Sequence, residues 1–448
     1  MLVIISDLHL TDGTSGETIE QGAFFLLRER LFSLAYDASW RAPGVYRPID
    51  RIDLILLGDI LDVIRSSYWC SAPPHVRPWG RPEDPAFISA VEKINAEILK
   101  HNQKSLGVIK SLSNCITIPA ADTKQMPVAE KEDFSGGNRV TVPVFVHYLV
   151  GNHDWFYHLP GAAFDRIRAA ASDTLGLANP AGPFPHDPGE YPQLLEIYRD
   201  HKVWARHGDI FDSDNFDGDR NTSSLGDAIV VELLNRFPAV VREKLGTRLP
   251  PACLEGLKEI DNVRPLVVIP TWIDSLLRRT CSKDQAKAVK DIWNGLANDF
   301  LEIDFVKQHK AALKFGLKVS TGVSIATLSR ALLWLKAKFG IGNEKPFYQN
   351  ALSEKAYKEG RAHFVVYGHT HHHEIVVLKA ANAKAGLPFD QVYINSGTWR
   401  AVHEMAAGDP KAEEFAGYKV MTYLVFYRDD ERVGREFESW SGALGKSS

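Results

Sequence analysis

Five short polar motifs recur along this chain, and four of them directly follow a short run of Val, Ile, Leu and aromatic residues. A run that is apolar throughout, rather than alternating, is typical of a strand buried on both faces of a parallel sheet. Residues that follow such strands gather at one edge of the sheet, where the carboxyl ends meet. The pattern therefore ties the fold to one cluster of polar side chains. The motifs are Asp7-Leu8-His9, Gly58-Asp59, Gly151-Asn152-His153-Asp154, His207-Gly208-Asp209 and Gly368-His369-Thr370-His371.

The apolar runs and the periodic segments between them predict an α/β core. Helical periodicity covers residues 18–36 and 86–112, whereas 68–85 is rich in Pro and Trp and predicts a loop. Residues 120–139 are polar and predict a loop or hairpin. Strands are expected at 2–6, 53–57, 144–150, 203–206, 363–367 and 392–394, with closing strands at 418–427 and 433–440.

Between residues 221 and 360 strand signals thin out and helical ones dominate. We interpret 221–360 as a mostly helical insertion, or cap, in a core made of 1–220 and 361–448. Within it, 305–343 interleaves Lys and Arg with apolar residues. We favour a cap with a solvated cationic face there; the alternative is peripheral contact with acidic lipid or diphosphate groups. The helical segments are 225–236, 253–260, 271–279, 285–310 and 324–338.

Composition narrows the class of protein. The net charge is −4, from 52 Lys and Arg against 56 Asp and Glu, so charge alone does not favour a nucleic-acid partner. The four cysteines lie far apart with no C-x-x-C, which favours a reducing compartment, and we expect a cytoplasmic protein. We see no signal peptide and no apolar run of about 18 residues, so no transmembrane segment is expected.

The residue types in the motifs are those of a metal site. Carboxylate and amide oxygens together with imidazole nitrogens suit Mn, Fe or Zn better than Mg or Ca. Asp7 and His9 are two residues apart and can point the same way where a strand ends, and so can His369 and His371. Glycines before Asp59, Asn152 and His369 allow a sharp turn and a close approach.

The five motifs in this order resemble the calcineurin-like metallophosphoesterase superfamily over roughly residues 1–220 and 361–440. The resemblance does not cover the insertion. It implies a four-layer α/β/β/α sandwich, an α/β (α+β) fold. It also implies two divalent metal ions, with Mn first and Fe or Zn as alternatives, and hydrolysis of phosphoester or pyrophosphate bonds by a hydroxide shared between them.

The resemblance also implies a role for each motif residue. One ion would be held by Asp7, His9 and His371, the other by Asn152, His207 and His369, and Asp59 would bridge both. His153 would protonate the leaving oxygen or stabilise phosphoryl charge, and Asp154 would orient His153.

Details of the motifs separate the branches of this superfamily. Ser6-Asp7-Leu8-His9-Leu10 and Gly58-Asp59-Ile60-Leu61-Asp62-Val63 differ from the blocks of the protein serine/threonine phosphatases. They look more like the UDP-2,3-diacylglucosamine pyrophosphohydrolases, which are shorter and usually carry Arg in place of His153. The substrate is therefore expected to be a small or lipid-linked phosphate compound. The alternatives are a nuclease and a metal-binding scaffold without catalysis that binds a partner protein.

Several neighbouring residues allow two interpretations. We slightly favour Asp62 as a helix N-cap over a residue that supports the metal ligands. His147 is expected to be a core histidine, and His372 and His373 exposed residues at the start of a strand. Residues 155–157 and 395–397 are as readily core or turn residues as parts of the site. The acidic run from Asp209 to Asp219 is expected to be a solvated loop rather than a calcium loop.

Overall fold

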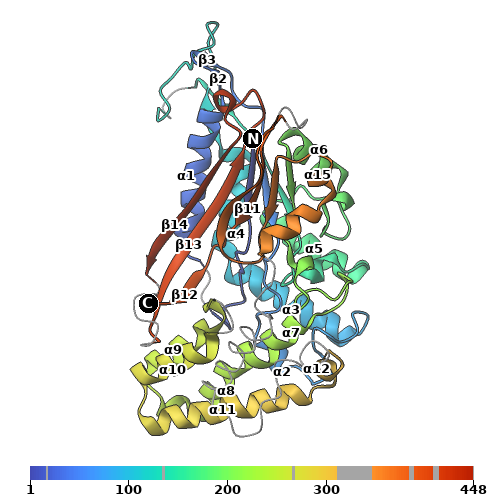
Figure 1. The fold of residues 1–448 in the computed structure, drawn as a ribbon, viewed down its shortest axis with the longest axis vertical. Coiled ribbons are helices and arrows are strands. Elements are labelled where there is room, and N and C mark those ends of the chain that lie inside the picture. The colour runs from blue at the N-terminus through green and yellow to red at the C-terminus, as the bar shows by residue number, and fades with distance from the viewer. Residues whose placement is uncertain are drawn as a thin grey trace.

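The apolar runs form the strands of two mixed sheets, so the chain has a mixed α/β fold (Figure 1). The computed structural model describes residues 1–16, 19–133, 137–264, 268–309, 346–382, 388–406 and 413–446. The first sheet has the order β12 (Ala401–Met405), β13 (Phe415–Phe426), β1 (Leu2–Ile5), β4 (Ile52–Leu57) and β7 (Val144–Leu149), with β14 (Phe437–Lys446) paired to β13. The second has the order β10 (His373–Lys379), β11 (Gln391–Ser396), β9 (Phe364–Tyr367) and β8 (Val203–Ala205).

The central strands of each sheet are parallel, which brings their carboxyl ends to one edge. In the first sheet β1 pairs in parallel with β4, and β4 with β7. In the second, β8 and β11 both pair in parallel with β9. Antiparallel strands close the sheets: β13 lies beside β1, and β10 beside β11. Each predicted polar motif therefore follows a parallel strand.

Both faces of the first sheet are buried, which explains why its strands do not alternate in polarity. Leu2, Ile4 and Ile55 share a hydrophobic cluster with Phe364 and Ile394 of the second sheet. The residues in between, such as Val3, Ile5 and Leu54, pack with a set of helices on the other face. Those helices are α1 (Gln21–Ala38), α3 (Pro85–His101), α4 (Gln103–Cys115) and α5 (Ala162–Leu175).

The outer face of the second sheet packs against short helical segments. Val365, Tyr367 and Tyr393 form a smaller cluster with Ala351 and Ala356. These alanines lie in the 3-10 helix η8 (Phe347–Ser353) and in α15 (Lys355–Lys358). Helix α6 (Pro192–Asp200) leads directly into β8.

The expected strands are confirmed, with the last one displaced to β14. Residues 120–139 lie between β5 (Thr117–Pro119) and β6 (Arg139–Thr141), so the hairpin prediction is confirmed. The small sheet of β2 (Trp40–Ala42) and β3 (Val45–Tyr46) was not predicted, and neither were β12, α5 and α6, whereas β10 begins at His373, as expected. The expected loop at 68–85 begins with one short helix, α2 (Tyr68–Ser71).

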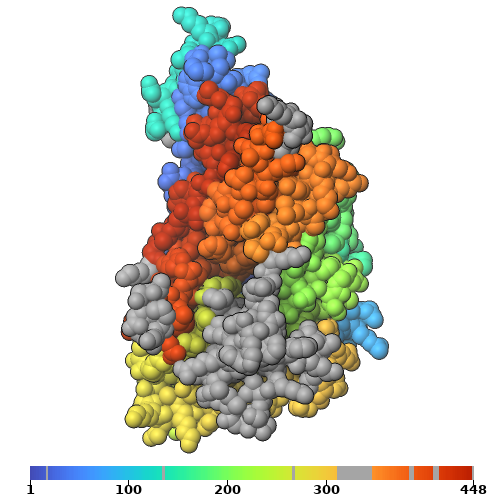
Figure 2. Space-filling view, in the orientation of Figure 1, coloured from blue at the N-terminus to red at the C-terminus, as the bar shows by residue number. Residues whose placement is uncertain are grey.

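Residues 225–308 are mainly helical, as expected, and their helices gather at one end of the long axis (Figure 1). The strands of the C-terminal part come down onto these helices (Figure 2), and Arg278 pairs with Glu413 at 3.1 Å. The predicted helix at 324–338 and most of the basic stretch 305–343 lie outside the described residues. The helices are α7 (Leu225–Ile229), the π-helix η4 (Val230–Asn235), α8 (Arg236–Leu245), α9 (Pro251–Lys258), α10 (Ile269–Thr280), α11 (Lys283–Glu302) and α12 (Asp304–Gln308).

The helices 225–308 share a continuous hydrophobic cluster with the helices that cover the first sheet. Val231 and Leu234 of η4 belong to the same cluster as Trp69 of α2 and Phe87 of α3. The buried Arg77 Nε donates to Glu232 at 2.6 Å, which adds an ion pair across this contact. Within the described residues, no helix combines the length and apolar composition needed to cross a bilayer.

The helical periodicity expected over 86–112 is confirmed, and it is divided between two helices, α3 and α4, which are separated at Asn102. The Asn102 backbone leaves the helical region, with φ −98° and ψ 12°. Its side-chain Nδ2 donates to the carbonyl oxygens of Ile98 and Thr11, at 2.8 Å each. Because Thr11 follows His9 by two residues, this side chain ties the helices to the loop that carries the first motif.

We expect Asn102→Ala to lower the free energy of unfolding by about 1–3 kcal/mol, because it leaves a buried carbonyl without its donor. Urea denaturation followed by circular dichroism measures the change. Asn114→Ala, at an exposed position of α4, is the control and should change stability by less than about 0.5 kcal/mol. Equal stability of the two variants would show that the Asn102 tether contributes nothing.

Candidate metal centre

The five predicted motifs meet where the carboxyl ends of the two sheets lie side by side. Asp7 follows β1, Asp59 follows β4, Asn152 follows β7, His207 follows β8 and His369 follows β9. The two sheets are joined at this point by a direct bond, since the His369 backbone N–H donates to Asp7 Oδ1 at 3.1 Å. The structure thus brings all the predicted ligand residues together.

The donor atoms fall into two groups with Asp59 between them. Asp7, His9 and His371 form one group, with His371 Nε2 at 3.3 Å from Asp7 Oδ1 and 2.9 Å from His9 Nε2. Asp59, His207 and His369 form the other. Asp59 Oδ2 lies 3.2 Å from His207 Nε2 and 3.7 Å from His9 Nε2, so its carboxylate faces both groups.

Asn152 completes the second group. Its Oδ1 lies 3.0 Å from His369 Nδ1 and 3.3 Å from His207 Nε2. The oxygen, rather than the amide nitrogen, therefore points into the cluster. This orientation matches a ligand oxygen.

The backbone at these positions is strained. Five of the ten non-glycine residues with positive φ in the described chain are predicted ligands: Asp7 (54°), His9 (45°), Asp59 (55°), His369 (69°) and His371 (60°). Left-handed backbone costs of order 1 kcal/mol for such residues and is concentrated at functional sites. The strain points these side chains into one small volume rather than along the strands.

Two glycines permit the close approach of the strands, as expected from the sequence. A Cβ on Gly151 would lie 2.5 Å from His207 Cδ2 and closer still to Asp59 Oδ1. A Cβ on Gly368 would lie 2.6 Å from Asp7 Oδ2. Any side chain at either position would displace a predicted ligand.

Three of the four ligand histidines are oriented through the ring nitrogen that faces away from the centre. His207 Nδ1 bonds the Leu57 carbonyl at 2.9 Å, His9 Nδ1 bonds Asp62 Oδ2 at 2.7 Å, and His369 Nε2 bonds Asp212 Oδ2 at 3.0 Å. An acceptor on the outer nitrogen holds the proton there and leaves the inner lone pair for a metal. The fourth, His371, is different, because its Nδ1 faces Arg264 Nη2 at 2.8 Å.

The two buried carboxylates experience opposite electrostatic effects. Burial, opposed by His207 and aided by the neighbouring Asp59, raises the pKa of Asp7 to about 6. Burial also acts to raise the pKa of Asp59, but His207 and His153 outweigh it and hold that pKa below its usual range. Burial, followed by nearby arginines, lowers the pKa of both His9 and His371. Neutral imidazoles beside paired carboxylates are a suitable donor set for divalent cations.

His153 lies against His9, and its partner is Asp62. His153 Nδ1 lies 2.9 Å from Asp62 Oδ1, and the two imidazole rings meet edge to face at 4.7 Å between centroids. Asp62 Oδ1 also accepts from the Arg65 backbone N–H at 3.0 Å. Asp62 therefore supports two histidines, and the helix N-cap that we slightly favoured is wrong, because no helix begins directly after it and its carboxylate caps only a local turn.

The prediction that Asp154 orients His153 is wrong. The Asp154 carboxylate accepts from the backbone N–H groups of Gly151 at 2.6 Å and Ile60 at 2.8 Å, and from the Tyr148 hydroxyl at 2.6 Å. It therefore fixes the loops that follow β4 and β7. Burial and the nearby Asp59 raise its pKa to about 7.

Neighbouring carboxylates also change the pKa of His153. Burial alone would lower its pKa, but Asp62 and Asp59 outweigh burial and raise it to about 9. The group is therefore protonated near neutral pH. A protonated imidazole held by one nitrogen is suited to donate a proton from the other.

The other residues that were singled out from the sequence lie in the core, at the surface or in support of the last motif. His147 is a core histidine, bonded to Asp53 Oδ1 at 3.3 Å, and 155–157 are buried core residues. His372 is exposed, as expected, and His373 is half-buried at the start of β10. Asn395 Nδ2 donates to the Gly368 carbonyl at 2.8 Å, so the 395–397 turn supports the last motif.

The acidic run is only partly the solvated loop that we expected. Asp214, Asp217 and Asp219 are exposed, but Asp209 is buried and pairs with Arg220, and Asp212 holds His369. Sequence reasoning missed Asp212; its position five residues after His207 was the available signal. It also missed Arg65, Arg264 and Arg400, for which no spacing pattern marks a role.

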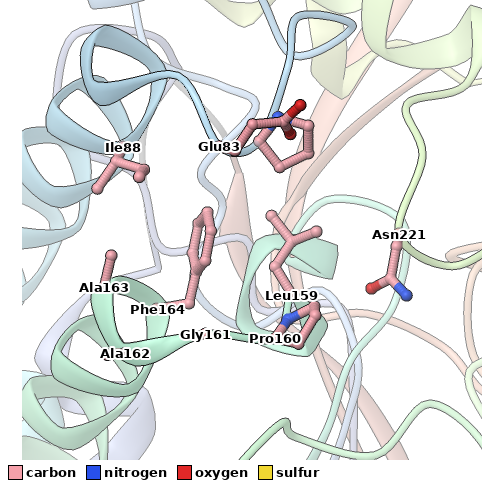
Figure 3. A pocket seen from close by; sticks show the side chains of 10 residues that line it. Glu83, Ile88, Leu159, Pro160, Gly161, Ala162, Ala163, Phe164 and Asn221 are labelled. Carbon is pink, nitrogen blue, oxygen red and sulfur yellow. The ribbon is translucent and has the colours of Figure 1, made fainter.

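One cavity lies away from this chemistry. It has a volume of about 480 Å³ and is lined by apolar residues such as Leu159, Pro160 and Phe164 (Figure 3). None of the predicted ligands lines it. A separate group of His158, His186 and Glu190 could also hold a cation, but His158 Nδ1 already bonds the Phe184 carbonyl at 2.8 Å.

No family model matches this chain, and a search of curated proteins finds no match. The geometry of the donor residues is therefore what indicates a metal site. That geometry consists of two donor groups, a carboxylate between them and a protonated histidine beside one of them.

We expect the metal-free protein to take up about two Mn²⁺ per chain and to unfold at a higher temperature with Mn²⁺ present. Asp59→Asn should lose most of both effects, because Asp59 faces both donor groups. Metal analysis after dialysis and thermal unfolding measure them.

Asp53→Asn is the matched control, since Asp53 is also buried on β4 but bonds His147. It should lower stability without changing metal uptake. Normal Mn²⁺ uptake by Asp59→Asn would contradict the proposed centre.

Proposed function

We propose that this chain is a dinuclear-metal-dependent hydrolase of phosphoester or phosphoanhydride bonds. The observation that carries the proposal is the placement of Asp59 between two donor groups, with His153 and Asp62 beside one of them. Two divalent ions held there would supply positive charge for a phosphoryl oxygen and lower the pKa of water. Mn²⁺ is our first choice, with Fe or Zn as alternatives, because imidazole and carboxylate donors are mixed.

In this proposal His153 is the catalytic acid. Asp62 holds its Nδ1, which fixes the ring and leaves Nε2 free to donate a proton to the leaving oxygen. Because the pKa of His153 lies at about 9, the proton is present at neutral pH.

The same proposal includes membership of the calcineurin-like metallophosphoesterase superfamily and its four-layer α/β/β/α sandwich. Supporting it, the two sheets share one hydrophobic cluster, α1, α3, α4 and α5 pack on the outer face of one sheet, and η8 and α15 pack on the other. The order of the five motifs supports it as well. A cytoplasmic location stays a prediction from the cysteine spacing.

The proposed substrate is a small or lipid-linked phosphate compound. The nuclease alternative needs a cationic track for a nucleic-acid backbone. Its candidate was the basic stretch 305–343, of which residues 310–343 lie outside the described chain. No observation in the described residues favours it, and none favours the non-catalytic scaffold.

We expect Mn²⁺-dependent hydrolysis of bis(p-nitrophenyl) phosphate by the wild-type protein. His153→Ala should lower kcat by about 10²–10⁴-fold, the usual contribution of a general acid. Asp59→Asn should abolish the Mn²⁺-dependent rate. Release of p-nitrophenol measures all three, and equal rates in the three proteins would refute the proposal.

The Asp62–His153 pair predicts a pH dependence. The negative charge of Asp62 raises the pKa of His153, so the rate should fall as pH rises through that pKa and the proton is lost. Asp62→Asn removes this charge and should move the alkaline limb of kcat/KM to lower pH. Asp154→Asn, which does not bond His153, should move the limb less; an unchanged limb in Asp62→Asn would exclude His153 as the acid.

A further inference from the structure

Three arginines from distant parts of the chain surround Asp261 beside the metal centre. Arg65 follows β4, Arg264 follows the 3-10 helix η6 (Glu259–Asn262), and Arg400 directly precedes β12. Arg65 Nε lies 2.7 Å and Arg400 Nη1 3.2 Å from the same oxygen, Asp261 Oδ2. Arg264 Nη1 donates to the Asp261 carbonyl at 2.6 Å. We call Arg65, Arg264 and Arg400 the arginine cluster.

The arginine cluster lies one imidazole ring away from the donor groups. Arg264 Nη2 is 2.8 Å from His371 Nδ1, and the other nitrogen of that ring faces Asp7. The charges of Arg400 and Arg65 contribute to the low pKa of His9, and those of Arg264 and Arg400 to the low pKa of His371. The cluster therefore flanks the side of the centre formed by His9 and His371.

The positive charge of the arginine cluster exceeds the negative charge within it. Arg65 and Arg400 share the Asp261 carboxylate, and Arg264 contacts only the Asp261 carbonyl. The nearby Asp62 is already engaged by two histidines. Burial and then the neighbouring Arg65 lower the pKa of Arg400 to about 9, which reflects this crowding of like charges. Buried positive charge without a counter-charge is costly, so an anion at this place would be bound strongly.

Arg65 shows the imbalance most clearly. Its side chain is 1% exposed, yet all three of its guanidinium nitrogens lack a hydrogen bond of acceptable geometry within the described residues. Other buried arginines there, such as Arg168 and Arg206, leave at most one nitrogen in that state. A planar guanidinium group with unused N–H donors suits an oxyanion such as phosphate, which accepts hydrogen bonds from two donors at once.

One member of the cluster, Arg65, borders a cavity. Together with Asp261 it lines a space of about 180 Å³, and neither Arg264, Arg400 nor a predicted metal ligand lines that space. Ser15 and Ser67 bound this cavity on the side of the core, and Lys258 bounds it on the side of the helices 225–308.

We propose that Arg65, Arg264 and Arg400 form a subsite that binds a second oxyanion of the substrate, next to the phosphoryl group that reacts. The location of the reacting group rests on the proposed function; the anion subsite itself does not. The residues that determine specificity would then come from both the core and the helical insertion. Substrates with two neighbouring anionic groups would be preferred over those with one.

The subsite is tested without catalysis by titrating inorganic phosphate into the metal-stripped, full-length protein in a calorimeter. We expect Arg65→Met to weaken binding by more than about tenfold, since it removes a buried guanidinium contact. Arg65→Lys keeps the positive charge but lacks the planar guanidinium group, and it should bind phosphate with intermediate affinity. Phosphate binding by Arg65→Met that equals the wild type would overturn the subsite.

A stability measurement separates an anion site from a structural role. Without phosphate, Arg65→Met should be at least as stable as the wild type, because Asp261 keeps Arg400 and an unsatisfied cation is removed. Arg77→Met is the matched control, since Arg77 is buried but fully engaged with Glu232 and backbone carbonyls. It should unfold at a lower temperature and keep phosphate binding. A loss of phosphate binding in Arg77→Met equal to that in Arg65→Met would also overturn the subsite.

Inhibition of the hydrolysis reaction connects the subsite to the substrate. ADP and AMP differ by one phosphate, and we expect ADP to inhibit bis(p-nitrophenyl) phosphate hydrolysis at least about tenfold more strongly. The ratio should approach one in Arg65→Met. Equal inhibition by ADP and AMP in the wild type would mean that the subsite takes free anions only and would overturn its role in substrate binding. If phosphate binds as expected but no Mn²⁺-dependent hydrolysis occurs, the proposed function fails and the anion subsite stands.

Discussion

The two sheets meet at a hydrogen bond, from the His369 backbone N–H to the Asp7 carboxylate. Both the arrangement of the sheets and the site depend on this bond. It joins the end of β9 to the end of β1, and Thr398 adds a second link by donating to the Asp7 carbonyl at 2.8 Å. Asp7 is fully buried and lies near Asp59, so this junction brings two carboxylates together in a region of low dielectric. Repulsion there opposes folding unless a cation is nearby. The packing of the sheets thus creates the electrostatic need that a metal would meet.

Asp62 holds several groups of the site in place, although it is not itself a predicted metal ligand. One carboxylate orients a predicted ligand, His9, and the proposed acid, His153, and also caps the turn that ends at Arg65. Since the same turn leads to Arg65, the loop after β4 supplies Asp59, Asp62 and Arg65 in seven residues. The ligand, the orienting group and the proposed anion contact are therefore fixed by one short segment.

The sequence predicted what depends on local pattern and missed what depends on tertiary contact. The strands before Asp7, Asp59 and Asn152 were predictable because each is a short run rich in Val, Ile, Leu and aromatic residues. The break at Asn102 was not, because it is stabilised by a bond to Thr11, far away in the chain. Asp154 was assigned to His153 because the two are adjacent in sequence, whereas in the structure His153 bonds Asp62 and Asp154 bonds the Gly151 backbone. Spacing therefore identified the residues that gather at the centre but not the bonds between them.

Arg65 illustrates how a functional requirement differs from a stability requirement. A fully buried guanidinium with unused donors lowers stability, and Met at the same position would avoid that cost. Arg77, which is also buried, has each group engaged and contributes to the contact between the helices 225–308 and the core. Two buried arginines in one protein thus have opposite energetic roles, and only the unsatisfied one faces the centre. A chain that keeps such a residue gives up some stability for what the residue binds, which is the physical reason for placing substrate recognition at the arginine cluster.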